Sequence, residues 1–591
     1  MAESLGDWKR THNCGDLRIE NVGNEVCLMG WVAKRRDHGG VIFVDLRDRF
    51  GITQVVFRPD LEATTHEIAE SIRNEYVLAI KGKVETRPEG MANPQLPTGA
   101  IDIECSDLKI LNEANTPPFA IEPDIDVNEE LRLRYRYLDL RRPDVQETIV
   151  RRHQTAQATR KYLIKNGFLE IETPFLMKST PEGARDYLVP SRVNQGLFYA
   201  LPQSPQTYKQ LLMIAGYERY FQIVRCFRDE DLRGDRQPEF TQIDIEMSFV
   251  TEKDVMDLAE GLAVHLFKEI IDVEIPSPIP QMTYQEAIDR YGSDRPDTRF
   301  GLEIVDIAEA AEASEFQVFK NILASGGQVR GINAKGCAKF SRKQIDDLGA
   351  FAGTFGAKGL AWIKVTDAGL ESSIVKFFPE GAQAKLRDAL DAEPGDLLLF
   401  VADKPDVVAQ VFGNIRLELA SHLDLLDPNQ FNMLWITRFP LLEWDEESKR
   451  FVACHHPFTS PLDADLDTME SDPASVLARA YDLVLNGNEI AGGSIRIHQS
   501  DLQERMFRLL DISAEEAREK FGFLLDAFQY GAPPHGGIAF GYDRLIALLS
   551  GKSFIRDVIP FPKTNTASSL MDGAPSKVGP EQLRELGLRL T

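Results

Sequence analysis

The sequence predicts a multidomain α+β protein, in which an N-terminal β-barrel precedes an antiparallel-sheet domain that carries an α+β insertion. Three observations predict this fold class. The chain has 591 residues, more than a single hydrophobic core usually holds. Its first 110 residues alternate polar and apolar side chains as strands do. Residues 300–420 are richer in alanine and lysine than the segments on either side, where strands and helices alternate.

Residues 1–110 predict a small barrel. The expected strands are residues 26–35, 41–47, 52–58, 76–85 and 101–110, with a helical pattern at 61–73. Five strands with a helix after the third is the order of an OB fold, which binds oligonucleotides on strands 2 and 3 and through the loops joining strands 1–2 and 4–5. We therefore expect the N-terminal domain to bind a nucleic acid.

The rest of the chain divides at changes in composition. Residues 111–143 read as a linker, with adjacent prolines, an acidic run and then several arginines. A helical pattern begins near residue 144 and stops at Asn166-Gly167, a usual C-terminal helix signal. We expect one sheet domain in two parts, residues 144–299 and 421–591, separated by the inserted domain at 300–420.

Composition limits the setting in which the protein works. The formal net charge is -25, which excludes a general nucleic-acid coat protein and requires any nucleic-acid contact to use local basic patches. The six cysteines are scattered without a CxxC pair, which favours reduced thiols and a cytosolic location over a zinc site. Neither a signal peptide nor an apolar run of about 18 residues occurs, so we expect no membrane span.

One candidate site lies in residues 220–249. A strand pattern ends at Arg228, an arginine-rich loop follows, and a second strand places Gln242, Asp244 and Glu246 on one face. The pattern alone is equally typical of a solvated hairpin. An arginine at a strand end beside further arginines is also how a sheet binds a polyphosphate.

A second candidate site lies in residues 531–549, where a glycine-rich strand enters a helix with Arg544 in its first turn. Glycines let a backbone approach a flat ligand closely, and an arginine can stack on a base or neutralise a phosphate. For the glycines alone, a buried strand-to-helix turn is the simpler interpretation.

These segments resemble motifs 2 and 3 of the class II aminoacyl-tRNA synthetases, at residues 227–230 and 537–544, with Ala539 in place of one motif glycine. The helix ending at Gly167 and residues 168–174 resemble motif 1, which forms the dimer interface in that family. Residues 180–190, 203–210, 454–460 and 492–496 resemble the bacterial aspartyl-tRNA synthetases, as does essentially the whole chain. The insertion resembles their GAD domain.

The resemblance implies a set of active-site residues. Aspartate binding is implied for Glu182, Gln206, Lys209, Arg228, Gln242, Asp244, His455 and Arg496. ATP binding is implied for Arg228, Asp229, Glu230, Gln237, Glu489, Gly541, Tyr542, Asp543 and Arg544, of which Arg228, Glu489 and Arg544 are also the expected catalytic residues. A carboxylate substrate suits a forked arginine and a lysine, and such a pocket should reject asparagine because a buried cation would lose its partner.

A magnesium site is expected in residues 481–490, which read as a hairpin with a turn at Asn486-Gly487. A two-residue turn places Val484 opposite Glu489, and Asp482 on the same face as Glu489, about 7–8 Å away at Cα. Two carboxylates this close suit a divalent cation shared with ATP phosphates. An exposed acidic hairpin is the alternative, but the family has metal-linked acids at these positions.

Recognition of tRNA is expected on the barrel. Residues 34–40 form a basic loop, and Phe43 shares the outer face of its strand with Asp45 and Arg47, which fits a platform for an unpaired base. An edge-packed phenylalanine is the alternative. The resemblance implies anticodon contacts for Arg36, Phe43, Gln54 and, where a relative has Glu, Asp102.

His38 and Gly90 match bacterial enzymes that aspartylate both tRNA-Asp and tRNA-Asn, whereas enzymes restricted to tRNA-Asp tend to have Leu and Lys there. The resemblance therefore implies a homodimer that charges both tRNAs and supplies aspartyl-tRNA-Asn to an amidotransferase.

Four alternatives remain: an enzyme restricted to tRNA-Asp, an asparaginyl or lysyl enzyme, a paralogue that adenylates another substrate, and an RNA-binding protein with an inactive core. Lys209 with Arg496, the barrel and the retained motif residues argue against the last three.

Overall fold

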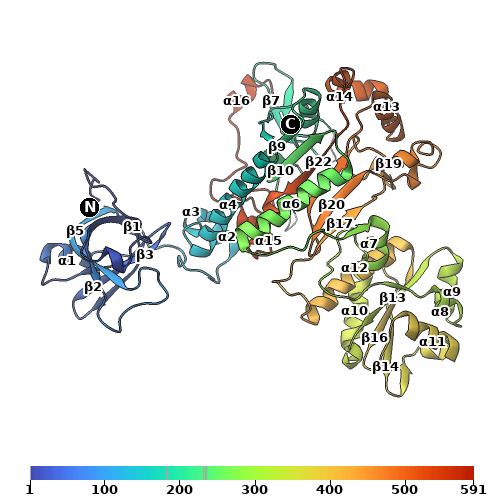
Figure 1. Ribbon diagram of the computed structural model, residues 1–591, viewed down its shortest axis with the longest axis horizontal. Coiled ribbons are helices and arrows are strands. Elements are labelled where there is room, and N and C mark those ends of the chain that lie inside the picture. The colour runs from blue at the N-terminus through green and yellow to red at the C-terminus, as the bar shows by residue number, and fades with distance from the viewer. Residues whose placement is uncertain (1, 181–183, 231, 233–235, 591) are drawn as a thin grey trace. The chain divides into compact units, whose positions relative to one another are not determined.

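The computed structural model describes residues 2–180, 184–230, 232 and 236–590, and its chain forms two compact units (Figure 1). The first unit comprises Met1–Val150 with Pro560–Thr564 and Ser568–Pro575. The second comprises Arg151–Ile559 with Asn565–Ala567 and Ser576–Thr591. None of the described helices is both long and apolar enough to cross a membrane.

The first unit contains the predicted barrel. Its strands are β1 (Glu25–His38), β2 (Val41–Asp48), β3 (Gly51–Phe57), β4 (Val77–Thr86) and β5 (Ile101–Asn112), with helix α1 (Ala63–Glu70) between β3 and β4. The barrel closes in the order β1-β2-β3-β5-β4. Alternate residues such as Ile42, Val44 and Leu46 are fully buried inside it. The expected OB fold is confirmed, and each predicted strand is correct to within a few residues.

Four of the linker arginines form ion pairs: Arg132, Arg136 and Arg142 with Asp139, and Arg141 with Glu75. Two short helices, α2 (Glu129–Arg134) and α3 (Arg136–Asp139), occupy this segment. Glu75, at the start of β4, accepts hydrogen bonds from Arg47 at 2.8 and 2.9 Å and from Arg141 at 2.8 Å. The expectation that Arg47 lies on the exposed outer face with Phe43 is therefore wrong, because Arg47 is buried against this carboxylate.

The second unit is built on an eight-stranded sheet in the order β11-β17-β20-β21-β22-β10-β9-β6. Neighbours are antiparallel except for the pairs β11–β17 and β6–β9. The strands are β6 (Leu169–Glu170), β9 (Arg219–Phe227), β10 (Glu239–Ser248), β11 (Gln281–Thr283), β17 (Met433–Thr437), β20 (Ala480–Leu485), β21 (Asn488–Ile495) and β22 (His535–Gly541).

Three helices cover one face of this sheet: α4 (Pro143–Lys165), α6 (Glu252–Ile271) and α15 (Tyr542–Leu549). Apolar side chains of β10, such as Ile243 and Ile245, pack with them in one core. Because side chains alternate along a strand, the polar residues of β10 point to the opposite face. The sheet therefore has one apolar face and one face that can line a binding site.

A separate sheet lies within residues 300–420, in the order β12-β13-β16-β14-β15. Its strands are β12 (Val305–Asp306), β13 (Gln328–Ala334), β14 (Ala361–Thr366), β15 (Gly369–Glu371) and β16 (Leu397–Asp403). Helices α10 (Arg342–Thr354) and α12 (Pro405–His422) pack on one face, and α8 (Ala308–Glu312), α9 (Gln317–Ala324) and α11 (Glu380–Ala389) on the other.

The remaining elements connect and cover these sheets. They are β7 (Leu188–Pro190), β8 (Phe198–Ala200), α5 (Gln206–Ile214), α7 (Tyr284–Tyr291), β18 (Leu442–Asp445), β19 (Arg450–Ala453), α13 (Ser500–Leu509), α14 (Ala514–Phe528) and α16 (Pro580–Glu585). Short 3-10 helices occur at Ile19–Asn21, Cys337–Lys339, Val375–Phe377, Asp463–Asp465, Pro473–Ser475 and Ile555–Val558.

Candidate active site

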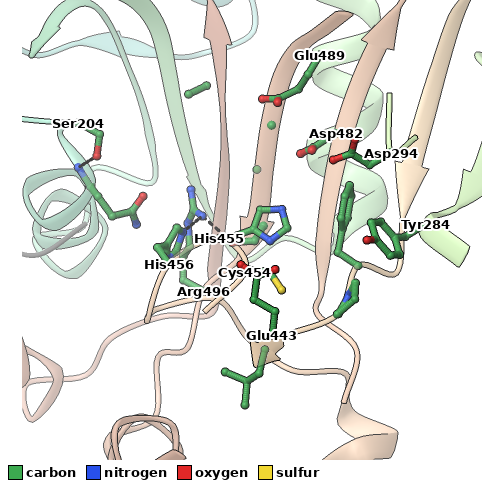
Figure 2. Close-up of a pocket in the computed structure, with 18 of the residues that line it drawn as sticks. Ser204, Tyr284, Asp294, Glu443, Cys454, His455, His456, Asp482, Glu489 and Arg496 are labelled. Carbon is green, nitrogen blue, oxygen red and sulfur yellow. Dashed lines mark hydrogen bonds between the residues drawn. The ribbon is translucent and has the colours of Figure 1, made fainter. Parts of the chain in front are cut away.

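Two adjoining cavities open on the polar face of the eight-stranded sheet. The larger has a volume of about 610 Å³ and the smaller about 270 Å³. Arg228, Gln242, Glu489 and Ala539 line both cavities. Figure 2 shows the larger one, with side chains from β20, β21 and the loop before them converging on its centre. A ligand with two connected parts would fit such a pair of cavities.

A buried cluster of charges forms one wall of the larger cavity. Lys209 Nζ, on α5, lies 3.0 Å from Asp244 Oδ2 and 3.2 Å from Glu246 Oε2. Arg496 forks onto Glu246 through Nε at 3.0 Å and Nη2 at 3.1 Å. All four residues are at most 3% exposed. The cluster balances two cations with two anions, which is how a protein tolerates buried charge.

The two carboxyl groups of the cluster respond differently to burial. Burial alone would raise the pKa of Glu246, but Arg496 and Lys209 outweigh it and lower that pKa to about 2. Burial raises the pKa of Asp244, which Lys209 only partly offsets. Asp244 Oδ1 is buried and has no hydrogen-bond partner among the residues that the structure describes. Asp244 lines the cavity, so this oxygen can accept a hydrogen bond from a bound ligand.

Two adjacent histidines complete this wall. His456 Nε2 lies 2.8 Å from Arg496 Nη1, and burial beside that cation holds the pKa of His456 well below its usual range. Burial and Arg496 also lower the pKa of His455 to about 4. The His455 ring packs edge-on against Phe439, and within the described part of the chain its Nδ1 has no hydrogen-bond partner. Both histidines are therefore neutral at pH 7, and His455 can hydrogen-bond a ligand.

The smaller cavity has the side chains expected around a nucleotide. Arg228 lies over the Phe240 ring at 5.0 Å, and Arg544 donates to the Glu489 carbonyl at 2.5 Å. Glu230, Gln237 and Gly541 also line it. The structure thus brings together most of the residues that the resemblance implied for ATP.

Three of the residues implied for ATP have other surroundings. Asp543 reaches the smaller cavity, but its carboxylate accepts from Arg152 at 2.5 Å and from the Thr241 amide at 2.7 Å. Tyr542 is buried, donates to the Arg152 carbonyl, and is absent from the lining of both cavities. Asp229 also lies outside the two linings. Glu182, implied for aspartate, falls outside the residues that the structure describes.

The predicted hairpin forms with its two-residue turn. Asn486 and Gly487 both have positive φ, of 49° and 79°, and Val484 pairs with Glu489 as expected. A β-bulge then shifts the register, so that Asp482 pairs with Gly492. A Cβ placed on Gly492 would lie 2.6 Å from Asp482 Oδ1 and 3.3 Å from Glu489 Oε1. Both carboxylates therefore converge on one small space.

This pair fits a magnesium ion better than a metal held by the protein alone. No group of three or more His, Cys, Asp or Glu side chains suited to a metal occurs in the described part of the chain. Mg²⁺ usually takes one or two carboxylates and completes its shell with water and substrate phosphates. Burial, and then the nearby carboxylates of Glu489 and Asp294, raise the pKa of Asp482 well above its usual range, and a bound cation would oppose this shift.

On the barrel, three of the implied tRNA-binding residues, Arg36, Gln54 and Asp102, are joined by hydrogen bonds. Arg36 donates to Asp45 at 2.6 Å and to Gln54 at 2.9 Å, and Gln54 donates to Asp102 at 2.8 Å. Arg87 also donates to Asp102 at 2.8 Å. These bonds hold the side chains in one orientation on the barrel surface.

The two residues implied for tRNA choice are both exposed. The His38 ring packs edge-on against the Phe43 ring, with centroids 6.2 Å apart. Gly90 has φ +81°, and nothing lies within 4 Å of a Cβ placed on it. A lysine would fit this space but would be strained by the backbone conformation.

From the sequence, no role was expected for several residues of the active site. Glu246, His456 and Ser494 surround Arg496, with Ser494 accepting from it at 2.6 Å. For Glu246 a signal existed, since it shares a strand face with Asp244. Asp294 and Arg295 also line the cavities, and no sequence motif pointed to them.

Comparison with known families agrees with this geometry. The family model described as tRNA synthetases class II (D, K and N) matches residues 128–565, and the model of the OB-fold nucleic acid binding domain matches residues 26–111. The chain belongs to the class II tRNA synthetases of this D, K and N group, and so it is an aminoacyl-tRNA ligase.

Individual relatives cover the whole chain. The aspartate–tRNA(Asp/Asn) ligase of Desulfatibacillum aliphaticivorans is 58% identical over 591 residues, covering 100% of this chain and 99% of the relative. The ligase of the same name from Geotalea uraniireducens (strain Rf4) is 59% identical over 589 residues, with the same coverage of 100% and 99%. Asparaginyl-tRNA synthetase from Pyrococcus horikoshii complexed with asparaginyl-adenylate has a TM-score of 0.60 at 20% identity, covering 94% of this chain and 98% of that one. This last likeness shows the fold.

The first prediction concerns Gly537. A Cβ at this position would lie 2.0 Å from Glu246 Oε2 and 2.3 Å from the Ile245 carbonyl oxygen. We expect Gly537→Ala to lower the free energy of unfolding of the second unit by about 1–3 kcal/mol, because the buried ion cluster must shift. Gly353→Ala, in an exposed part of α10 with nothing nearby, is the control and should be neutral or stabilising. Denaturant unfolding measures both, and equal stability of the two variants would contradict the prediction.

The second prediction concerns pH. His455 has a folded pKa of about 4, below its usual value of 6.5, so the unfolded chain binds this proton first as pH falls. His455 therefore does not lower the free energy of unfolding above pH 6.5. Between pH 6.5 and 4 it lowers the free energy of unfolding by roughly 3 kcal/mol. In His455→Gln, the free energy of unfolding should fall less over this interval than in the wild type. His422→Gln, at an exposed histidine, is the control. An unchanged pH dependence in His455→Gln would refute the assignment.

Proposed function

We propose that the protein activates L-aspartate with ATP and transfers it to tRNA-Asp and tRNA-Asn. The observation that carries this proposal is the buried pair of cations, Lys209 and Arg496, in the wall of the larger cavity. A carboxylate side chain can pair with them, whereas asparagine would leave part of this charge without a partner. The smaller cavity beside it is the proposed ATP site, which is supported by Glu230, Gln237 and Arg544 in its lining.

The proposed chemistry has two steps. The α-carboxylate of aspartate attacks the α-phosphate of ATP in line, which forms aspartyl-adenylate and releases pyrophosphate. A terminal ribose hydroxyl of the tRNA then attacks the carbonyl carbon of the adenylate, and AMP leaves. Arg228 lines both cavities, so its guanidinium can bridge the two reacting groups. Orientation and charge neutralisation account for the rate without a protein nucleophile.

Magnesium fits the same scheme. Asp482 and Glu489 would hold the ion beside the smaller cavity, where it would neutralise phosphate charge and orient the leaving pyrophosphate. Without magnesium, the close carboxylates of Asp482 and Glu489 would have no cation between them and the phosphates. Activity should therefore require magnesium.

Use of tRNA-Asn is supported by two lines of argument. His38 and Gly90 match enzymes that charge both tRNAs, and the relatives at 58% and 59% identity bear the name aspartate–tRNA(Asp/Asn) ligase. The aspartyl-tRNA-Asn formed would then be the substrate of an amidotransferase. An enzyme restricted to tRNA-Asp is the alternative. We place the reaction in the cytoplasm, where its substrates are.

We also propose functions for the parts of the chain. Residues 1–110 are proposed to recognise the anticodon through Arg36, Phe43, Gln54 and Asp102. The pairing of Arg36 with Phe43 in neighbouring strands and the hydrogen bonds from Arg36 to Gln54 and from Gln54 to Asp102 support this choice. Residues 111–143 are the hinge, residues 144–299 with 421–591 catalyse the reaction, and residues 300–420 form the inserted GAD domain.

The third prediction tests the reaction. With labelled aspartate, ATP and magnesium, the protein should charge tRNA-Asp and tRNA-Asn transcripts, and EDTA should abolish both activities. Lys209→Met should lose at least about 100-fold in kcat/KM for aspartate, because truncation leaves Asp244 and Glu246 short of a cation. Charging of tRNA-Asp alone would establish the restricted enzyme, and charging of neither would favour a paralogue.

The fourth prediction tests the homodimer. Strand β6 is an edge strand, and Leu169, Phe175 and Leu176 are 51%, 45% and 53% exposed. An exposed apolar group on a sheet edge suits contact with a second copy. Light scattering should give twice the mass of one chain for the wild type, and Leu169→Asp should shift it toward one chain. Val318→Asp, on the inserted domain, should stay dimeric. A monomeric wild type would refute the proposal.

A further inference from the structure

A short segment outside every recognised motif reaches the proposed ATP site. We call residues 292–300 the connector, because they join α7 to the inserted domain. Within it, Asp294 lines the larger cavity and Arg295 lines the smaller one. Figure 2 shows Asp294 beside Asp482. The connector therefore brings two adjacent charged side chains to the place where the phosphates and the metal would lie.

The inserted domain holds the connector from one side. Arg416 of α12 is 1% exposed. It donates to the Asp297 carbonyl of the connector at 3.3 Å, and to the carbonyls of Gly301 at 3.0 Å and Leu302 at 2.7 Å, which directly follow the connector. Its guanidinium also lies over the Phe300 ring at 4.9 Å. A buried cation that binds three carbonyls in one loop fixes that loop to its own helix.

The β20–β21 hairpin, which bears Asp482 and Glu489, holds the connector from the other side. A Cβ placed on Gly487, at the tip of the hairpin, would lie 3.3 Å from Asp297 Cβ. The side chain of Asn432 donates through Nδ2 to the Thr298 carbonyl at 3.1 Å. Its backbone N–H donates to Asn486 Oδ1 at 2.9 Å. The connector thus packs between the hairpin that bears the metal ligands and a helix of the inserted domain.

Arg295 has the charge and the freedom to bind a ligand. Its side chain is exposed and has no ion-pair or hydrogen-bond partner among the described residues. Two other charged groups of the smaller cavity, Glu230 and Asp543, are already in ion pairs: Glu230 lies 2.5 Å from Arg236, and Asp543 lies 2.5 Å from Arg152. The Arg295 amide donates to Ser293 Oγ at 3.2 Å, which fixes the backbone from which the guanidinium extends.

We propose that Arg295 is a further ATP-binding residue, which contacts the phosphate chain through its guanidinium and is positioned by the inserted domain. The inference rests on the proposed function, because it takes the smaller cavity as the ATP site. A guanidinium forms paired hydrogen bonds with phosphate oxygens. The inserted domain then contributes to amino acid activation through the connector.

The test compares Arg295→Gln and Arg295→Lys with the wild-type full-length chain. One readout is aspartate-dependent exchange of pyrophosphate into ATP without tRNA, which gives separate KM values for ATP and aspartate. The second readout is the equilibrium binding of a non-hydrolysable ATP analogue in the presence of magnesium, measured by calorimetry. The matched control is Arg342→Gln, which removes an exposed arginine on α10 of the inserted domain, outside both cavities.

We expect Arg295→Gln to weaken ATP binding and raise its KM on the order of tenfold, as loss of a charged hydrogen bond does, while the KM for aspartate changes less than about twofold. Arg295→Lys should recover part of the loss, and Arg342→Gln should match the wild type. Unchanged ATP binding in Arg295→Gln would overturn the inference. So would a loss confined to tRNA charging, which would assign the arginine to tRNA phosphates. Absence of exchange in the wild type would instead refute the proposed function.

Discussion

The active site depends on the buried pairing of Glu246 with Arg496 and Lys209. Glu246 lies in the middle of β10, between β9 and β22, and is fully buried. Two cations in such a place would be unstable without a fixed anion, and one anion without them would become protonated. The carboxylate of Glu246 therefore holds both cations in the cavity wall, where their remaining donors can face a ligand.

The glycines of the third motif serve this same pairing. Gly537 lies opposite Glu246, and the space where its Cβ would stand is filled by the Glu246 carboxylate. Gly492 leaves a similar space for the carboxylates of Asp482 and Glu489. A glycine in a strand interior normally weakens the strand, so these positions are better explained by the charged groups they admit than by close approach of a ligand alone.

The two arginine-rich regions of the sequence have different physical roles. In the linker, Arg141 and Arg136 pair with buried carboxylates of the same unit, so their charges are neutralised within the fold. In the active site, Arg228 and Arg295 lie at cavity walls. The inserted domain shows both roles, because its buried Arg416 holds the loop on which Arg295 is exposed. Burial and pairing, rather than the count of arginines, decide which of them can bind a ligand.

The sequence alone determined the periodic and local features of this protein. The five barrel strands, the two strands around Arg228 and the Asn486-Gly487 turn follow from side-chain alternation and turn chemistry, which act over a few residues. Only the tertiary structure decided which charges meet across long stretches of sequence. Glu246 pairs with Arg496 across 250 positions of sequence, Arg47 is buried against Glu75, and the connector reaches the hairpin. Such pairings depend on how distant strands stack, because an ion pair has no periodicity along the chain to reveal it.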